Sequence, residues 1–501
     1  MIVKNYDAEF CGKIPIHHIN LIQPHGYLLV LDRNDQRIVQ LSENIQSLFG
    51  KTPEEIIGTN FSEWIAEPLD LTKLSTNANS HQKTPYYLTI YEQRCLALVQ
   101  AKEKYLIVEL TAASGDRRDF LEIYQTLTYY FSVIEEANDL PSLLKATVEQ
   151  IRLVSGFDRV MIYQFDENWN GKVIAEVNHT GKTDYLGQQF PPSDIPKTAR
   201  DLYQRNPYRL IPTSRYEPVK LYPIVNPITL SFMDLSDCHL RSVPKVHLEY
   251  LQNMGVDASM SVRILIDNRL WGLISFHHNT PKYPDFELCS QLQLLAEFFT
   301  RQLANLLNKE HFDLSREISM HKNALLNDLY EKESLEEALL NQQEHLLKLF
   351  ACDGAALIFQ NKLHLLGKVP DDEHIQNFVF WLQEKNVDRV FAVNNLSDLF
   401  EEAKAFASVA SGMLVIEIDK DHGNYLICFR PEHPYTINWG GNPNEALQFE
   451  SDKKNYHPRN SFVIWRQQIQ HTSLAWKNEE LLAASDLRHY LFEHLRRHPL
   501  D

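Results

Sequence analysis

The stretch HLEYLQNMGVDASMSVRILIDNRLWGLISFHH (residues 247–278) predicts a short helix followed by a β-hairpin. Pro244 just before it and Gly255 within it mark the start and the end of the helix. Spacings of three and four residues place four side chains on one helix face: His247, Tyr250, Leu251 and Met254. A single histidine on an apolar helix face is usually a core residue, so this helix alone leaves a structural role for His247 open.

The hairpin turns at Asp267–Asn268. Ser259 and Ser261 lie two residues apart on its first strand, so their hydroxyls face the same side, and His277 ends its second strand. An earlier hairpin is expected in DRVMIYQFDENWNGKVIAEVN (residues 158–178). The ~80 residues between the two hairpins are too many for a simple loop, so they are either functional or disordered. Their aromatic residues, prolines and short helical stretches argue against disorder.

The insertion contains FPPSDIPKTARDLYQRNPYRL (residues 190–210), which predicts a helix starting after Pro196 and ending at Asn206. Asp194 therefore lies in a proline-stiffened loop directly before a helix. It is either a capping acid or a carboxylate held for a partner cation. Guanidiniums and hydroxyls in and around the insertion would form an anion clamp. That set comprises Tyr203, Arg209, Arg241, Ser259 and Ser261.

The first ~120 residues predict a five-stranded sheet with short helices, the size of a small sensory module. A single cysteine, Cys11, lies on the tail before them, without a second cysteine or metal-ligand spacing nearby. On these residues alone it is a bystander unless a pocket lies within reach. The six cysteines are scattered singly, which indicates a reducing compartment rather than a disulfide framework.

From Phe286 to about Phe350 the apolar spacing is helical. One long helix suited to a dimer interface and two ordinary packed helices both remain open. A third α/β block follows, then a long segment rich in Gly, Pro and Asn, and a charged helix over Ser473–His498.

Composition excludes several classes of protein. The formal net charge of −17 disfavours nucleic-acid binding, because phosphate contacts need clustered Lys and Arg. No apolar run is long enough to span a membrane, and the N-terminus has no signal pattern, so we expect a cytoplasmic protein without membrane contacts. We find no P-loop, H-E-x-x-H, G-x-S-x-G or histidine-kinase motif, and therefore expect no enzymatic activity.

Taken together, these motifs resemble a bacteriophytochrome photosensory core. The resemblance covers essentially the whole chain and is carried by these stretches: Cys11 with IQPHG, FPPSDIP, HLEYLQNMGV, LWGLISFHH, WGGNP and PRNSF. It implies a multidomain α+β and α/β protein, with a PAS-like sheet domain, a GAF domain and a GAF-related PHY domain joined by long helices. The implied boundaries are 1–118 for the tail and PAS domain, 119–308 for GAF and 309–501 for PHY, with a tongue at about 430–464. It further implies that the N-terminal tail is threaded through the GAF insertion in a figure-of-eight knot.

The resemblance also implies the chromophore: biliverdin IXα, a linear tetrapyrrole, attached by a thioether to Cys11. Cys238–His239–Leu240 imitates the attachment site of plant and cyanobacterial relatives. Alignment on HLEYLQNMG places Val246 at that position instead, so we expect Cys238 to be a bystander. The implied chromophore contacts are Tyr163, Tyr185, Phe190, Asp194, Ile195, Tyr203, Arg209, Arg241, His247, Tyr250, Ser259, Ser261 and His277.

Within this set the resemblance implies individual roles. The Asp194 carbonyl would face the pyrrole N–H groups, His247 would hold the pyrrole water, and His277 would bind the ring-D carbonyl. Tyr203, Arg209 and Arg241 would hold one propionate, and Ser259 and Ser261 the other. Four aromatic side chains would enclose ring D: Tyr163, Tyr185, Phe190 and Tyr250.

The implied function is a red/far-red photoreceptor. Isomerisation between rings C and D would be relayed by Asp194 and Arg459, with Ser461 and Trp439, to the tongue and the long helices. The implied partners are a second copy of the chain and an output domain or response regulator. The alternative is a tandem GAF-type sensor of a small diffusible ligand such as a cyclic nucleotide. It is disfavoured because such a sensor has no use for Cys11 with IQPHG or for the DIP loop.

Three departures from the family pattern stand out. The proline before His247 is one place early, Tyr185 replaces a common phenylalanine, and WGGNPN lacks an acid and a base of the usual motif.

Overall fold

The computed structural model describes residues 19–70, 74, 81–113, 119–384, 389–445, 447–449 and 456–498. The chain divides into two compact units. The first runs to Ala304 and includes Asn438–Trp465, and the second comprises Asn305–Ile437 and the residues from Arg466 onward.

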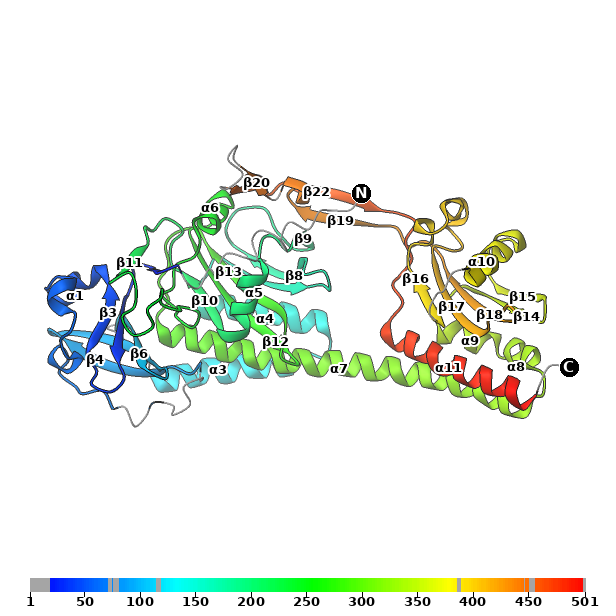
Figure 1. The fold of residues 1–501 in the computed structure, drawn as a ribbon, viewed down its shortest axis with the longest axis horizontal. Helices are drawn as coiled ribbons and strands as arrows, with labels where there is room; N and C mark the ends of the chain where they lie inside the picture. Colours follow the sequence, from blue (N-terminus) through cyan, green and yellow to red (C-terminus); the bar gives the residue numbers. More distant parts are fainter. Residues whose placement is uncertain are drawn as a thin grey trace. The chain divides into compact units, whose positions relative to one another are not determined.

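The first sheet of the first unit has seven strands among the described residues, in the order β1-β11-β3-β2-β6-β5-β4. Figure 1 shows most of this sheet in blue. Its strands are β1 (Leu21–Ile22), β2 (Tyr27–Asp32), β3 (Ile38–Ser42), β4 (Thr84–Ile90), β5 (Gln93–Ala101), β6 (Tyr105–Ala112) and β11 (Val219–Tyr222). Short helices follow β3: η2 (Glu43–Ile45), α1 (Gln46–Phe49), α2 (Pro53–Ile56) and η3 (Phe61–Glu63).

Five of these strands, β2 to β6, correspond to the predicted sheet. The two others were not predicted, because β11 comes from the insertion about 100 residues later and pairs with both β1 and β3. Leu21 and Ile22 of β1 face Lys220 and Val219 of β11, and Ile22 also bridges to Arg241. These contacts place the start of the described chain against the insertion. The threading of a knot stays a prediction.

The second sheet of the first unit has eight strands in the described residues, ordered β10-β12-β13-β7-β8-β9-β19-β22. Its first six are β7 (Arg159–Phe165), β8 (Gly171–Asn178), β9 (Gln188–Phe190), β10 (Tyr208–Ile211), β12 (Ala258–Ile266) and β13 (Arg269–His278). The predicted hairpin turn is confirmed: Asp267 and Asn268 both have positive φ, at 51° and 60°, as a tight two-residue turn requires.

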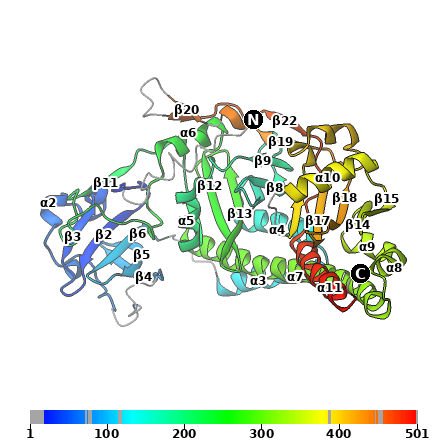
Figure 2. The same cartoon turned by 45° about the vertical axis from the view of Figure 1, so that its right-hand side comes forward.

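Helices cover both faces of this sheet (Figures 1 and 2). On one side lie α3 (Phe120–Glu135), α4 (Leu140–Ser155) and the start of α7 (Phe286–Glu331); on the other lie α5 (Lys197–Arg205) and α6 (Lys245–Asn253). Helix α5 starts after Pro196 and ends at Asn206, and α6 starts after Pro244, as predicted. The insertion is therefore ordered, and its two helices oppose the sheet.

The helical region after Phe286 is one 46-residue helix, α7, followed by α8 (Leu335–Asn341) and α9 (Gln343–Leu349). As far as the structure describes it, the second unit then forms a five-stranded sheet, ordered β15-β14-β18-β17-β16. Its strands are β14 (Gly354–Phe359), β15 (Lys362–Gly367), β16 (Val390–Val393), β17 (Gly412–Asp419) and β18 (Asn424–Arg430). Its remaining helices are α10 (Asp372–Glu384), η5 (Leu396–Asp398), η6 (Glu401–Phe406) and α11 (Asn478–Arg497), so the last helix begins at Asn478 rather than at Ser473.

The predicted tongue contains β19 (Tyr435–Gly440), η7 (Pro443–Glu445), β20 (Leu447–Phe449), β21 (Tyr456–Pro458) and the start of β22 (Ile464–Ile469). Strand β19 pairs in parallel with β9, with Asn438 facing Gln188 and Trp439 facing Gln189. The tongue therefore extends the second sheet. In the part of the chain that the structure describes, no helix has the length and apolar character needed to cross a membrane.

Candidate functional site

The polar residues predicted from the sequence meet on one face of the second sheet. Register places Ser259 opposite His277 and Ser261 opposite Ser275, while Arg209 faces Ser261 from β10. Met161 and Tyr163 of β7 continue the same face opposite Ser275 and Leu273. Because alternate residues of a strand share a face, these side chains form one continuous surface.

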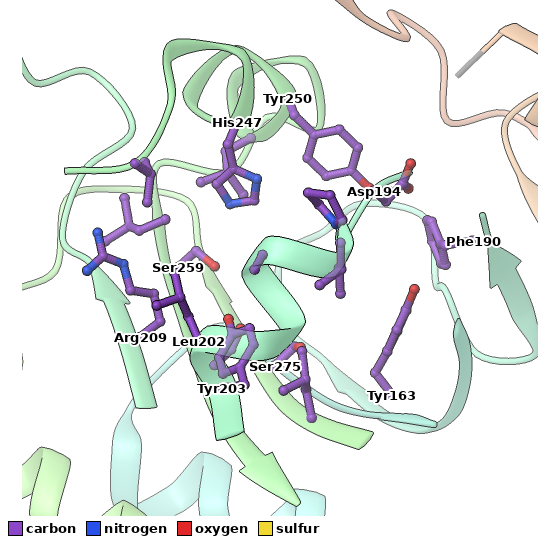
Figure 3. Close-up of a pocket in the computed structure, with 18 of the residues that line it drawn as sticks. Tyr163, Phe190, Asp194, Leu202, Tyr203, Arg209, His247, Tyr250, Ser259 and Ser275 are labelled. Carbon is purple, nitrogen blue, oxygen red and sulfur yellow. Dashed lines mark hydrogen bonds between the residues drawn. The ribbon is translucent and has the colours of Figure 1, made fainter. Parts of the chain in front are cut away.

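A cavity of about 260 Å³ lies between this surface and the helices opposite it. Its roof is the loop around Asp194, followed by α5 with Leu202 and Tyr203, and by α6 with His247 and Tyr250 (Figure 3). Pro458 of the tongue also lines it. Aromatic and aliphatic side chains supply most of its wall, and charged and hydroxyl groups gather at separate points.

All the predicted chromophore contacts within the described residues line this cavity. They are Tyr163, Tyr185, Phe190, Asp194, Ile195, Tyr203, Arg209, Arg241, His247, Tyr250, Ser259, Ser261 and His277. The remaining predicted residue, Cys11, lies outside the described residues. His247 thus lines the cavity, and its role toward a ligand stays a prediction.

In the predicted anion clamp, the guanidinium of Arg209 is held by backbone carbonyls. Arg209 donates to the carbonyls of His239 (3.0 Å) and Arg241, and its Nε has no hydrogen-bond partner among the described residues. Burial lowers the pKa of Arg209, and burial followed by the charge of Arg209 lowers the pKa of Arg241 to about 9. Two neighbouring cations, Arg241 buried and Arg209 half-buried, favour an anionic ligand.

The two cavity histidines are neutral at pH 7. Burial, followed by the charge of Arg209, lowers the pKa of His247 to about 4. Burial, followed by the charge of Arg159, lowers the pKa of His277 to about 3. The Nδ1 atom of His277 has no hydrogen-bond partner in the described part of the chain. Each ring therefore offers one donor and one acceptor nitrogen.

Asp194 forms the predicted ion pair with Arg459, and both side chains are almost fully buried. Tyr250 donates its hydroxyl to Oδ2 of Asp194 at 2.8 Å. Burial raises the pKa of Asp194, and Arg459 and Tyr250 act against that rise. The guanidinium also lies 5.0 Å from the ring centre of Phe462. The pair thus ties the loop before α5 to the tongue.

Two glycines let the tongue approach the cavity wall. A Cβ on Gly440 would lie 2.4 Å from Cε1 of Phe190, and Gly441 adopts a φ of +97° beside the carbonyl of Ser461. Trp439 is buried beside them, whereas the side chain of Ser461 is exposed. Of the predicted relay, Asp194 and Arg459 are therefore in contact. Trp439 lies on β19 directly before Gly440, and Ser461 follows Arg459 by two residues.

A second buried ion pair stands behind Tyr185. Nε of Arg159 lies 3.0 Å from Oε1 of Glu176, and both side chains are at most 2% exposed. The guanidinium of Arg159 sits 4.2 Å from the ring centre of Tyr185, and Glu176 accepts from the Tyr185 backbone N–H at 2.7 Å. This pair fixes the ring that replaces the common phenylalanine.

Comparison with known proteins agrees with this geometry. Three family models match: the PAS fold at residues 11–113, the GAF domain at 139–307 and the phytochrome region at 318–499. The bacteriophytochrome of Xanthomonas campestris pv. campestris is 30% identical over 96% of this chain and 78% of its own length. The chain belongs to the phytochrome family.

Other phytochromes extend this result. Cyanobacterial phytochrome B of Nostoc is 34% identical over 96% of this chain, which spans 65% of that relative's length. The crystal structure of an R. palustris bacteriophytochrome matches with a TM-score of 0.81 and 31% identity, over 96% of this chain and 98% of its own. The phytochrome photosensory core module of Stigmatella aurantiaca matches with a TM-score of 0.81 and 33% identity, over 97% and 98%. The predicted family and fold class are confirmed, and the nucleotide-sensor alternative is not favoured.

Phytochrome membership implies a bilin chromophore, and the cavity fits one. A linear tetrapyrrole is apolar along its length and carries two carboxylates, which match the aromatic wall and the Arg209–Arg241 pair. Oγ of Ser193 and Nδ1 of His277 are buried polar atoms without a hydrogen-bond partner in the described ranges, and each needs an acceptor or a donor. The described residues contain no cluster suited to a metal ion.

Sequence reasoning missed several polar residues of this phytochrome cavity, among them Ser193, Thr198 and Ser275. Ser275 could have been predicted from the sequence, since it lies two residues before His277 on the same strand and so shares its face. Cys238, predicted to be a bystander, also lines the cavity, but burial raises the pKa of its thiol well above the ordinary value. Such a thiol is a poor nucleophile.

Proposed function

We propose that this chain is the light-sensing module of a red/far-red photoreceptor, with biliverdin IXα in the GAF cavity bonded through a thioether to Cys11. The observation that carries the proposal is the cavity itself, an aromatic-lined space with the guanidiniums of Arg209 and Arg241 at one side. Family membership supports the same conclusion. Bound biliverdin would supply the photochemistry, an isomerisation between rings C and D.

The chain's own residues bind and orient the pigment in this proposal. Arg209 and Arg241, with Tyr203, take one propionate, and Ser259 and Ser261 take the other. The neutral ring of His277 holds a carbonyl, and His247 with the backbone of Asp194 faces the pyrrole nitrogens. Tyr163, Tyr185, Phe190 and Tyr250 exclude water from the isomerising end.

The Asp194–Arg459 pair serves as the relay. A change in the hydrogen bonds around Tyr250 alters the carboxylate that anchors Arg459, and the tongue is bound through that arginine. The tongue is thus a two-state element biased by the cavity, as a switch requires. The signal then passes to the helices and to an output domain or response regulator.

We propose further that two copies associate through the long helices. Helix α7 exposes apolar side chains, among them Phe312 (67% exposed) and Met320 (57%). Light scattering of the purified chain measures the mass directly, and a monomer at micromolar concentration would contradict the association.

The decisive experiment for the pigment is co-expression with a biliverdin-producing haem oxygenase. We expect a red-absorbing product that converts reversibly under red and far-red light. A denaturing gel stained with zinc should show bilin fluorescence that is lost in Cys11→Ser and kept in Cys238→Ser. A colourless protein refutes the function, and the opposite gel pattern refutes only the attachment site.

A further inference from the structure

One short segment joins the first sheet to the carboxylate-binding side of the cavity. Leu240 lies between the two residues whose carbonyls hold Arg209, namely His239 and Arg241. The chain bends at His239 and Leu240, and the carbonyls on either side of Leu240 converge on one guanidinium. The two carbonyls that hold Arg209 therefore have the orientation that the backbone of Leu240 imposes.

Both backbone groups of Leu240 are bound from the N-terminal part of the chain. Its N–H donates to Oε2 of Glu109 on β6 at 2.7 Å, and its carbonyl accepts from the N–H of Gln23 at 2.7 Å. The Leu240 side chain packs where Gly26 has no Cβ, since a Cβ there would lie 2.7 Å from Cδ2 of Leu240. The segment is thus fixed on three sides by residues outside the GAF domain.

The carboxylate of Glu109 accepts a hydrogen bond on each of its two oxygens. Its side chain is 3% exposed, and its other oxygen accepts from Nζ of Lys83 at 2.7 Å. A buried carboxylate with a cation on one oxygen and a backbone N–H on the other has a single well-defined position. No hydrogen bond or ion pair within the described residues joins Glu109 directly to Arg209.

We propose that Glu109 is a positioning residue for the carboxylate clamp: through Leu240 it fixes the two carbonyls that aim Arg209 at the pigment's propionate. This inference rests on the proposed binding of a bilin in the cavity. Its physical basis is entropy, because an arginine side chain that is already immobilised loses little freedom when a carboxylate arrives. The first domain thereby contributes to pigment affinity without touching the cavity.

The test compares biliverdin with its dimethyl ester, which has no propionate charge. Both are titrated into the full chain carrying Cys11→Ser, so that binding is reversible, and the red absorbance band reports the Kd. The parent chain should prefer the free acid. Glu109→Ala should reduce that preference about tenfold, the equivalent of one lost charge-assisted contact, while the affinity for the ester stays within about twofold.

Two further variants keep the test decisive. In Lys83→Met with Glu109→Leu, both members of the buried pair become apolar, a replacement that proteins often tolerate, and the preference should fall as in Glu109→Ala. Asp237→Asn is the matched control. It weakens contacts of the same segment with Lys102 (2.8 Å) and Arg205 (3.0 Å) but leaves the Leu240 anchor intact. It should change both affinities alike.

If the Glu109 variants lose affinity for biliverdin and for its ester to the same extent, the inference is wrong. It is also wrong if Asp237→Asn reduces the preference for the free acid as much as the Glu109 variants do. If the parent chain binds neither pigment, the proposed function itself fails. Thermal unfolding of each variant without pigment confirms that the compared chains are folded.

Discussion

Burial sets the protonation state of individual residues in the cavity. His277 is a neutral imidazole because solvent is excluded and Arg159 lies on the neighbouring strand, not because of any feature visible in the sequence around it. Its position, by contrast, was predictable, since the motif LWGLISFHH fixes it at the end of a strand. Sequence patterns thus located the residue, and only the packed structure assigned its protonation.

The lowered pKa of His277 makes stability depend on pH. An unfolded histidine takes up a proton near pH 6.5, whereas folded His277 resists protonation down to about 3. Its contribution is therefore present above pH 6.5 and is lost as pH falls toward 3. For the pigment-free chain, His277→Asn should reduce the stability difference between pH 7 and pH 5 by about 2 kcal/mol.

Urea unfolding at the two pH values measures this difference. The control is His433→Asn, which removes an exposed histidine outside the cavity. An unchanged difference in His277→Asn would contradict a neutral buried ring.

Asp194 carries a prediction about the photocycle. Asp194→Ala leaves the cation of Arg459 buried and unpaired, a change that typically costs ~3–5 kcal/mol at fully buried sites. The pigment should still attach, but far-red-absorbing product should not accumulate under red light.

The control for Asp194→Ala removes another contact of α6 with the tongue. Glu249 and His457 lie 3.0 Å apart and are both well exposed, so Glu249→Ala should give a normal photocycle. Normal far-red product in Asp194→Ala would argue against the relay.

At the scale of elements, the tongue depends on one close approach. Strand β19 reaches β9 only because residue 440 has no side chain where the Phe190 ring lies. The WGGNP stretch was part of the family resemblance, which implied the tongue. The pairing of β19 with β9 was not predicted, because the two strands are about 250 residues apart and nothing local in either strand encodes it.

Gly440→Ala should therefore loosen the tongue. The added Cβ and the Phe190 ring cannot both keep their positions, so amide exchange in residues 435–440 should speed up at least about tenfold, while β12 and β13 stay protected. Combining it with Phe190→Ala should restore much of the protection because the ring is then absent. If the single variant exchanges like the parent chain, the close approach is not what limits docking.

At the scale of the first unit, β11 makes two sheets interdependent. It belongs to the insertion that roofs the cavity, and it completes the N-terminal sheet between β1 and β3. The sequence predicted five local strands correctly, because hairpins are encoded by neighbouring residues. It could not reveal the exchange of a strand between blocks, which depends on contacts across about 180 residues.

Leu221 tests this interdependence. It is fully buried among residues of β2, β6 and the insertion, so Leu221→Ala should cost about 2–4 kcal/mol. Hydrogen exchange should accelerate in the seven-stranded and the eight-stranded sheet together. Leu88→Ala is the comparison, because Leu88 is buried in the core of the N-terminal sheet and not beside β11. If Leu221→Ala affects one sheet only, the two do not unfold as a single cooperative body.

The placement of β11 also constrains how the chain is made. When β2 to β6 have left the ribosome, Val219–Tyr222 have not yet been released. The nascent N-terminal sheet therefore lacks the strand that pairs with β3. Vectorial synthesis therefore cannot finish the first domain before much of the second has emerged. The edge of β3 stays unpaired for that interval, and an unpaired strand edge is a template for pairing with another chain.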